Sequence, residues 1–229
     1  MRIIVTGASK GLGKVLAEEF ALRGHQVGLL ARSVRLLDEI CGSLATATGK
    51  QNVHARACDL SSAEEVQTNV PILVAEMGGV DVLINNASSI VKKGLLEMSA
   101  DEWRKSMSTG IDAAFHCARA VMPYFLTQGG GHIINISSLS TKISLERGVS
   151  YSASKHALNG FSKSMVHELH RLGIKVCTIH PGAFTVEGDD VSSWKMPATE
   201  VFRACEYVVN SHPKAFVEEL VVRPLTWPE

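Results

Sequence analysis

The chain has 229 residues and no net charge, because 23 lysines and arginines balance 23 aspartates and glutamates. This balance gives no electrostatic reason to expect binding to nucleic acid or to an anionic membrane surface, and no apolar run approaches the roughly 18 residues of a membrane-spanning helix. Since no shift in composition divides the chain, we expect a single domain over residues 1–229.

Strands and helices alternate along the sequence. Short apolar, often β-branched runs predict strands, and apolar residues at helical spacing predict helices between them. The predicted strands cover residues 3–5, 26–31, 52–58, 80–84, 132–136, 174–180 and 215–222. The predicted helices cover residues 15–22, 34–44, 99–126, 151–172 and 199–210, with a further one from Ser61 to the glycines at 78–79. This alternation predicts a parallel sheet with helices on both faces.

Several side chains mark the ends and faces of these helices. Ser33 is a candidate cap, and Ser61 and Ser99 each precede a glutamate by three residues, as in a capping box. Pro71 lies inside a helical stretch at a cost of roughly 3 kcal/mol, so we expect a kink or a restart there. An apolar stripe in the helix over 99–126 predicts core or subunit interface: Trp103, Met107, Ile111, Phe115, Ala118 and Met122.

The segment Thr6–Gly13 joins the first strand to the first helix and carries glycines at positions 7, 11 and 13. A helix N-terminus presents unpaired N–H groups to an anion, and glycines let the backbone approach a diphosphate closely. The spacing G-x-x-x-G-x-G also suits a plain strand–helix turn, so the motif alone leaves both interpretations open.

Two cations lie where a dinucleotide fold would meet the adenosine ribose. Arg32 follows the glycine turn by about twenty residues, the place where a carboxylate binds the 2′-hydroxyl of NAD, and Lys10 lies inside the turn. A pair of cations favours a 2′-phosphate and hence NADP(H) over NAD(H). The alternative is two solvated surface side chains.

The residues Tyr151 and Lys155 are four apart in a predicted helix and so share one face, with Ser138 at the end of the preceding strand. A lysine ammonium stabilises a phenolate and lowers the phenol pKa toward the range where proton transfer is efficient. Ser138 could hold a substrate oxygen beside the phenol. A surface pair worth a few tenths of a kcal/mol is the alternative.

The five cysteines and nine histidines show no metal-binding pattern. The cysteines contain no C-x-x-C and are typical of reduced packing residues, which predicts a cytoplasmic protein. His167 and His170 lack the four-residue spacing of a helical zinc site, and a solvated helix face is favoured. A strand signal from residue 2 leaves no room for a signal or transit peptide, so none is expected.

The full set of motifs, in order, is Thr6-Gly7-x-x-x-Gly11-x-Gly13, Asp59, Asn85-Asn86-Ala87, Ser138, Tyr151-x-x-x-Lys155 and Pro181-Gly182. In this set the sequence resembles the short-chain dehydrogenase/reductase family over essentially its whole length. The resemblance implies a Rossmann-like, doubly wound parallel sheet of about seven strands in three α/β/α layers. It also implies a nicotinamide dinucleotide, hydride transfer to or from a small-molecule carbonyl or alcohol, and a homodimer or homotetramer built on the two long helices.

The resemblance also implies roles for individual residues. Tyr151 would be the general acid in reduction, Lys155 would bind the nicotinamide ribose, and Ser138 would orient the carbonyl. Asp59 would meet the adenine ring, and Asn86 would stabilise the central strands. The expected coenzyme-binding residues are Gly7, Ser9, Lys10, Gly11, Leu12, Gly13, Arg32, Asp59, Leu60, Asn86, Ala87, Tyr151, Lys155, Pro181, Gly182 and Thr185. No metal ligand is expected.

Three positions depart from the family pattern. Gly110 replaces the asparagine that holds a relay water, Ser88 replaces a glycine after Asn86-Ala87, and Val186 replaces a threonine whose work Thr185 could do. The segment 186–197 is short for a substrate lid, which predicts an open pocket. Substrate specificity would come from loops that contain Lys92, Lys93, Lys142, Arg147, Glu187 and Trp194, unless these are merely solvated.

These features predict an NADPH-dependent reductase of ketones or aldehydes. A non-catalytic NADP(H)-binding regulatory or scaffold protein on the same fold is the alternative, motivated by Gly110 and the short lid. A sugar-nucleotide epimerase is a distant third, because the chain lacks the length of an added substrate domain.

Overall fold

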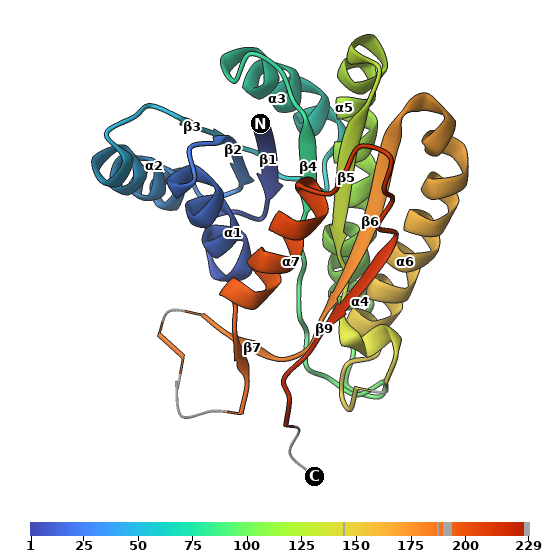
Figure 1. Cartoon of the computed structure of the whole chain (residues 1–229). Helices are drawn as coiled ribbons and strands as arrows, with labels where there is room; N and C mark the ends of the chain where they lie inside the picture. Colours follow the sequence, from blue (N-terminus) through green and yellow to red (C-terminus); the bar gives the residue numbers. More distant parts are fainter. Residues whose placement is uncertain (144, 187, 190–193, 227–229) are drawn as a thin grey trace.

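The computed structural model describes residues 1–143, 145–186, 188–189 and 194–226 (Figure 1). Within this part of the chain, seven parallel strands form one sheet in the order β3-β2-β1-β4-β5-β6-β9. The strands are β1 (Arg2–Thr6), β2 (Gln26–Ala31), β3 (Val53–Ala57), β4 (Val82–Asn85), β5 (Gly131–Ile136), β6 (Ile174–Pro181) and β9 (Glu219–Val222). The strand order reverses between β1 and β4, and the Rossmann-like α/β prediction is confirmed.

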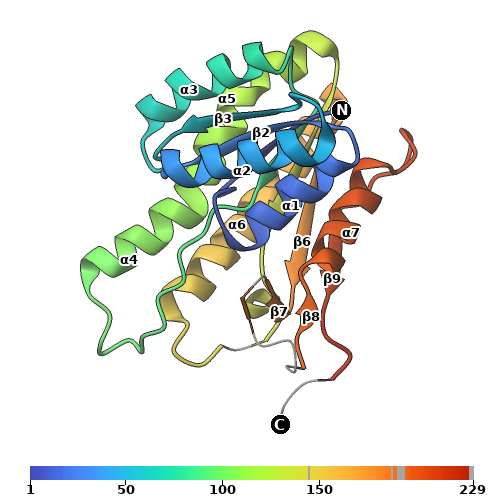
Figure 2. The same cartoon turned by 90° about the vertical axis from the view of Figure 1, so that its left-hand side faces the viewer.

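Helices cover both faces of the sheet. They are α1 (Gly11–Leu22), α2 (Val34–Thr48), α3 (Ala63–Glu76), α4 (Ala100–Met107), α5 (Ala113–Gln128), α6 (Val149–Leu169) and α7 (Thr199–Val209). Buried residues of α1, α2 and α7 share one hydrophobic cluster with the sheet, and those of α3, α5 and α6 share another. Figures 1 and 2 show the two helix layers on opposite faces, which gives three α/β/α layers.

Close packing between the sheet and α3 depends on a glycine in β2. A Cβ atom added at Gly28 would lie 2.5 Å from Met77 Sδ and 3.0 Å from Leu73 Cδ2. The missing side chain therefore lets the helix approach the sheet more closely than a larger residue would allow.

The start and the interior of α3 differ from the prediction. The cap is Ser62, whose side chain accepts a hydrogen bond from Glu65 N at 3.2 Å, one residue later than the predicted Ser61. Glu65 Oε2 instead accepts from Asp59 N at 2.7 Å, so no capping box forms at this end. The helix also runs through Pro71, so the restart expected as one of two outcomes is not found. The predicted caps at Ser33 and Ser99 are confirmed.

The long helix predicted over residues 99–126 is divided. Between α4 and α5 lies η1 (Ser108–Asp112), one π-helical segment with five-residue hydrogen bonding. On either side of this segment, Trp103 and Phe115 are 38% and 45% exposed, while Ala118 is buried. The stripe is therefore not continuous core, and its assignment to a subunit interface stays a prediction.

The carboxyl-terminal elements are shorter than predicted. The last strand begins at Glu219 and not at Ala215, because Val217 packs against the hydrophobic cluster without pairing to β6. A small additional sheet joins β7 (Phe184–Thr185) to β8 (Met196–Pro197). Residues 187 and 190–193 lie outside the described part, and the prediction of an open pocket falls on them.

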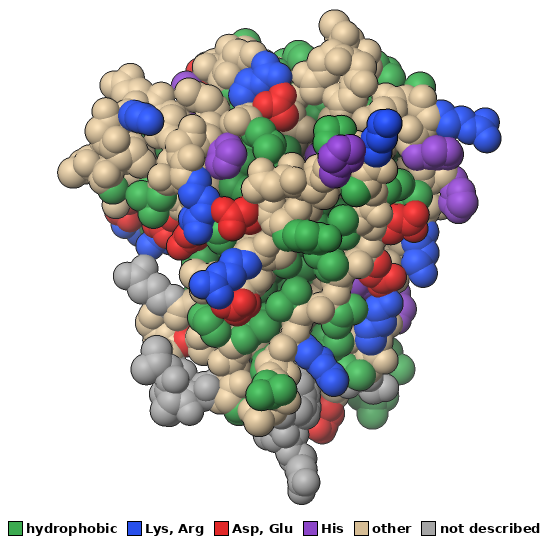
Figure 3. Space-filling model, viewed as in Figure 1, with side chains coloured by type: hydrophobic (Ala, Val, Ile, Leu, Met, Phe, Trp, Pro, Cys, Tyr) green, Lys and Arg blue, Asp and Glu red, His purple; other side chains and the backbone are tan. Residues whose placement is uncertain are grey.

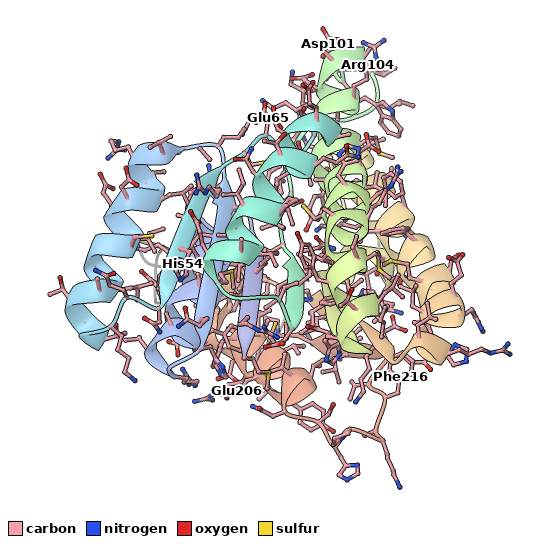
Figure 4. All side chains as sticks on the ribbon, turned by 90° about the horizontal axis from the view of Figure 1, so that it is seen from above. His54, Glu65, Asp101, Arg104, Glu206 and Phe216 are labelled. Atoms are coloured by element: carbon pink, nitrogen blue, oxygen red, sulfur yellow. The ribbon has the colours of Figure 1, made fainter. Side chains whose placement is uncertain are left out.

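The surface carries charges of both signs. On the face in Figure 3, lysines and arginines lie next to aspartates and glutamates, with apolar side chains between them. Arg23 and Glu206 form one ion pair at the surface: the Arg23 guanidinium is 2.6 Å from Glu206, a residue of α7 that is labelled in Figure 4. No helix in the described residues is long and apolar enough to cross a membrane.

Candidate active site

The turn between β1 and α1 has the shape of a phosphate cradle. Gly7 and Gly11 have φ values of +65° and +58°, a region that side chains other than glycine rarely adopt. A Cβ at Gly13 would lie 2.3 Å from Gly7 O, so only glycine fits there. A Cβ added at Gly11 would have no described atom within 4 Å. The turn therefore offers open space at a helix N-terminus and fits a dinucleotide diphosphate.

Asn86 ties this turn to β4. Its side-chain Nδ2 donates to Thr6 O at 2.9 Å, and its backbone N donates to Thr6 Oγ1 at the same distance. The neighbouring Ala87 N also donates to Thr6 Oγ1, at 3.1 Å. Thr6 itself is buried and was assigned no role from the sequence, although its place at the end of β1 was visible. The network places Asn86 and Ala87 beside the glycine turn.

The predicted adenosine-binding residues gather at the carboxyl ends of β2 and β3, which are neighbouring strands. Arg32 is exposed, and it lowers the pKa of Asp59 by its charge, after the larger effect of hydrogen bonds from Ser61 to that carboxylate. Leu60 is buried, and its carbonyl faces His116 Nδ1 at 3.1 Å.

The remaining predicted coenzyme-binding residues lie in the turn before α1. The exposed Lys10 precedes the first residue of α1. Ser9 and Leu12 lie in the same turn, partly exposed and buried respectively.

Ser138 and Tyr151 come together at the carboxyl end of β5. Burial raises the pKa of Tyr151, and the Ser138 side chain partly offsets that effect, so the lowering expected from Lys155 is not found. Ser138 is held in turn by the backbone of η2 (Leu139–Thr141), since its Oγ accepts from Ser140 N at 3.1 Å. Tyr151 lies in the first turn of α6, which begins at Val149. The Ser138 side chain thus lies near the Tyr151 phenol.

Lys155 lies one helical turn beyond Tyr151 and is 2% exposed. Its Nζ donates to Ile136 O at 2.7 Å and is 5.7 Å from the centre of the Tyr151 ring. Burial lowers the pKa of this lysine to about 8. An ammonium buried without a carboxylate partner is costly, so the position is typical of a functional group.

The loop after β6 completes the arrangement. Gly182 N donates to Val222 O at 2.7 Å, and a Cβ at this position would lie 2.9 Å from Pro224 Cδ and 3.0 Å from Arg223 Cβ. Pro181, the last residue of β6, immediately precedes Gly182 and is buried. Thr185 belongs to β7, where its carbonyl accepts a hydrogen bond from Ala198 N at 3.0 Å. The Thr185 side chain is partly exposed.

Gly110, in place of the family's asparagine, lies against the helix that carries Tyr151. A Cβ at Gly110 would be 2.9 Å from both Cβ and Oγ of Ser154. Ser154 Oγ donates to Tyr151 O at 2.8 Å. The glycine therefore lets η1 approach α6 directly beneath the predicted catalytic residues.

The loop cations named from the sequence are mostly engaged in ion pairs. Lys93 pairs with Glu102, Arg147 with Glu97, and Lys142 with Glu219, each at 2.5 Å. Lys92 is exposed, Trp194 is 37% exposed, and Glu187 lies outside the described residues.

Sequence analysis assigned no role to His180, which is fully buried beside Ser138. Its position immediately before Pro181-Gly182 was the available signal. Among the described residues, no cluster of three or more His, Cys, Asp or Glu side chains could hold a metal ion.

Comparison with known proteins decides the family. A sequence profile described as short chain dehydrogenase matches residues 1–194. The chain belongs to the short-chain dehydrogenase family. It is therefore an NAD(P)-dependent dehydrogenase or reductase that acts on a small molecule.

Relatives of this short-chain dehydrogenase span nearly its full length. An uncharacterized oxidoreductase of Staphylococcus epidermidis is 27% identical over 226 residues, which cover 97% of this chain and 96% of the relative. An uncharacterized oxidoreductase of Staphylococcus aureus strain N315 is 29% identical over the same shares.

Solved structures agree closely in fold. Serine dehydrogenase from Escherichia coli has a TM-score of 0.90 and 25% identity, with all of both chains covered. A metagenomic short-chain oxidoreductase in complex with NADP has a TM-score of 0.86 and 30% identity over 99% of this chain and 98% of that one. Acetoin dehydrogenase from Salmonella typhimurium has a TM-score of 0.85 and 29% identity over 96% and 93%.

Proposed function

We propose that this short-chain dehydrogenase reduces a ketone or aldehyde with NADPH, and oxidises the alcohol in the reverse direction, through Ser138, Tyr151 and Lys155. The observation that carries the proposal is a buried lysine, Lys155, one helical turn from Tyr151, with its Nζ 5.7 Å from the Tyr151 ring centre and the Ser138 side chain near the phenol. The nicotinamide ring, when bound, supplies the hydride that the carbonyl carbon accepts.

Each of the three side chains has one task. The Ser138 hydroxyl holds the carbonyl oxygen next to the phenol. Tyr151 donates its proton to that oxygen as negative charge develops there, and because burial raises its pKa, the phenol is protonated at neutral pH. The Lys155 ammonium, 5.7 Å from the ring centre, stabilises the phenolate that is left.

NADP(H) is the proposed coenzyme, with NAD(H) less favoured. Lys10 and Arg32 are exposed cations on the two turns that would flank the adenosine ribose. A 2′-phosphate would form charge-assisted hydrogen bonds with them. Asp59, which lies near Arg32, would meet the adenine ring. The metagenomic relative in complex with NADP supports the same preference.

A carbonyl panel tests the proposal. Purified protein is mixed with NADPH and a diketone, a quinone, an aldehyde or a ketoester, and NADPH oxidation is followed by absorbance. We expect turnover with at least one carbonyl, and a loss of about 10²- to 10⁴-fold in Tyr151→Phe with NADPH binding retained.

The second candidate function is non-catalytic NADP(H) binding, for which Gly110 is the specific observation. It would leave the relay water without its usual partner. No carbonyl-dependent oxidation by a protein that still binds NADPH would favour this function.

Three further features stay proposals: a single domain over residues 1–229, a homodimer or homotetramer, and a cytoplasmic location. Sedimentation of the purified protein tests the assembly.

A further inference from the structure

His180 occupies an unusual position behind the predicted catalytic serine. It lies near the end of β6, is fully buried, and faces the turn that follows β5. Its Nδ1 is 3.2 Å from Ser138 O and 2.9 Å from Thr141 Oγ1. Thr141 Oγ1 also donates to Ser138 O, at 2.8 Å. The carbonyl of Ser138 is therefore held by a neighbouring strand as well as by its own turn.

The other side of the imidazole faces β9. Its Nε2 is 2.7 Å from Glu219 Oε1, and the same oxygen is 2.5 Å from Lys142 Nζ. Lys163 of α6 adds a favourable charge near this carboxylate. The histidine thus lies between the turn that holds Ser138 and a strand distant in sequence, and among the described residues its Nε2 has no hydrogen-bond partner.

We propose that His180 is a positioning residue: through Nδ1 it fixes the Ser138 carbonyl and so directs the Ser138 hydroxyl toward the Tyr151 phenol. A carbonyl oxygen only accepts hydrogen bonds, so this contact requires the Nδ1 proton. Ser138 Oγ and Ser138 O belong to one residue held between β5 and η2, and a shift of the carbonyl moves the hydroxyl as well. An error of about 1 Å in such a group costs on the order of 10²-fold in rate.

The inference rests on the proposed function, since it concerns the serine that orients the substrate carbonyl. It adds a residue outside the Ser-Tyr-Lys set and a direction: the Nδ1 side of the ring matters for turnover. Because burial lowers the pKa of His180, the ring is neutral and holds one proton, so with that proton on Nδ1 its Nε2 does not donate to Glu219.

Two amide substitutions separate the two sides of the ring. The amide nitrogen of His180→Asn can take the place of Nδ1, and that of His180→Gln can take the place of Nε2. We expect kcat of His180→Asn to stay within about threefold of wild type, and kcat of His180→Gln and His180→Val to fall about tenfold or more. The His180 side chain takes part neither in the glycine turn nor in the backbone hydrogen bond from Gly182 N to Val222 O, so the dissociation constant for NADPH should not change.

Thermal unfolding of each variant provides the structural control. Low kcat with unchanged NADPH affinity in His180→Gln, together with a rescued His180→Asn of similar or lower melting temperature, supports the inference. The reverse order of activity, equal activity in all variants, or losses that only follow the melting temperatures would overturn it. If wild-type protein shows no turnover on the carbonyl panel, the proposed function fails first and takes this inference with it.

Discussion

At the scale of single residues, Lys155 has the strongest consequence for stability. Its ammonium lies in the interior with the Ile136 carbonyl as its hydrogen-bond partner, and burial lowers its pKa to about 8. The unfolded chain holds this proton up to a pKa near 10.5, so between these values the folded state binds fewer protons. Stability must then rise with pH across that window.

Replacement of this lysine should remove the rise. Below pH 8 the charged side chain costs about 3 kcal/mol, a cost that Lys155→Met does not have. We expect the free energy of unfolding of wild type to gain about 2 kcal/mol over the variant between pH 7.5 and 9.5. Urea unfolding of the coenzyme-free protein measures this, and parallel curves for the two proteins would contradict it.

The charge of Arg32 leads to a prediction on the choice between NADPH and NADH. Without its charge, a 2′-phosphate loses a charge-assisted contact worth about 1.5–3 kcal/mol. We expect Arg32→Ser to lower the ratio of kcat/KM for NADPH to that for NADH by about 10- to 10²-fold. The matched control is Arg56→Gln, because Arg56 lies within β3 and pairs with Glu76. An unchanged ratio in Arg32→Ser would assign the 2′-phosphate to other residues.

At the scale of elements, the contact between η1 and α6 depends on a missing side chain. Gly110→Ala places a Cβ 2.9 Å from two atoms of Ser154, so one of the two elements must shift. We expect a loss of about 1–3 kcal/mol in stability, largely recovered in the double variant with Ser154→Gly. Chemical denaturation measures both values.

A glycine elsewhere provides the opposite control. Gly42 lies inside α2, where a Cβ would meet no described atom within 4 Å. Alanine has the higher helix propensity, so Gly42→Ala should stabilise the protein by up to about 1 kcal/mol. Equal effects at the two glycines would show that packing against Ser154 is not the cause.

The sequence predicted the order and type of the elements well, and their ends less well. The strands that form the centre of the sheet are short apolar runs buried on both faces, a pattern typical of central parallel strands. The start of the last strand was wrong because the apolar residues Phe216, labelled in Figure 4, and Val217 do not pair with β6, and Val217 packs against the hydrophobic cluster instead. The π-helical segment was missed because it leaves no break in helical composition, only a shift of one residue.

The same limit applies to the candidate site. The glycine turn and the pair of Tyr151 and Lys155 are each ambiguous alone. They were selected, with Ser138, by their order and spacing as a set. His180 was missed because its partners, Ser138 and Glu219, are distant in sequence and meet only after β5, β6 and β9 have aligned. The carbonyl panel and the His180 variants test the chemistry proposed for these residues.

At the scale of the whole molecule, the end of the sheet opposite the candidate site is held by an ion pair. Arg2 of β1 donates from N and Nε to Asp81 Oδ2 at 2.7 and 3.2 Å, and also reaches Gly78 O at 2.5 Å. Burial tends to raise the pKa of Asp81, but hydrogen bonds and charge from Arg2 outweigh it and leave the pKa lowered. The carboxylate therefore joins β1 to the segment before β4.

Removal of this carboxylate should affect stability but not turnover. We expect Asp81→Ala to lower the free energy of unfolding by about 1–2 kcal/mol at pH 7, with kcat unchanged. Because the folded pKa is lowered, the contribution is present above the ordinary aspartate pKa and is lost as pH falls through the folded value. Glu39→Ala, which breaks an exposed pair with Arg35, should change stability by less than about 0.5 kcal/mol.

The position of β9 has a consequence for synthesis on the ribosome. β9 pairs with β6, and its backbone holds Gly182 while its Glu219 meets His180. During translation, the segments that bear Ser138, Tyr151 and Lys155 emerge before this strand exists. A nascent chain without β9 thus lacks the backbone partner of Gly182, and the loop after β6 can take its place only when the outermost strand has arrived.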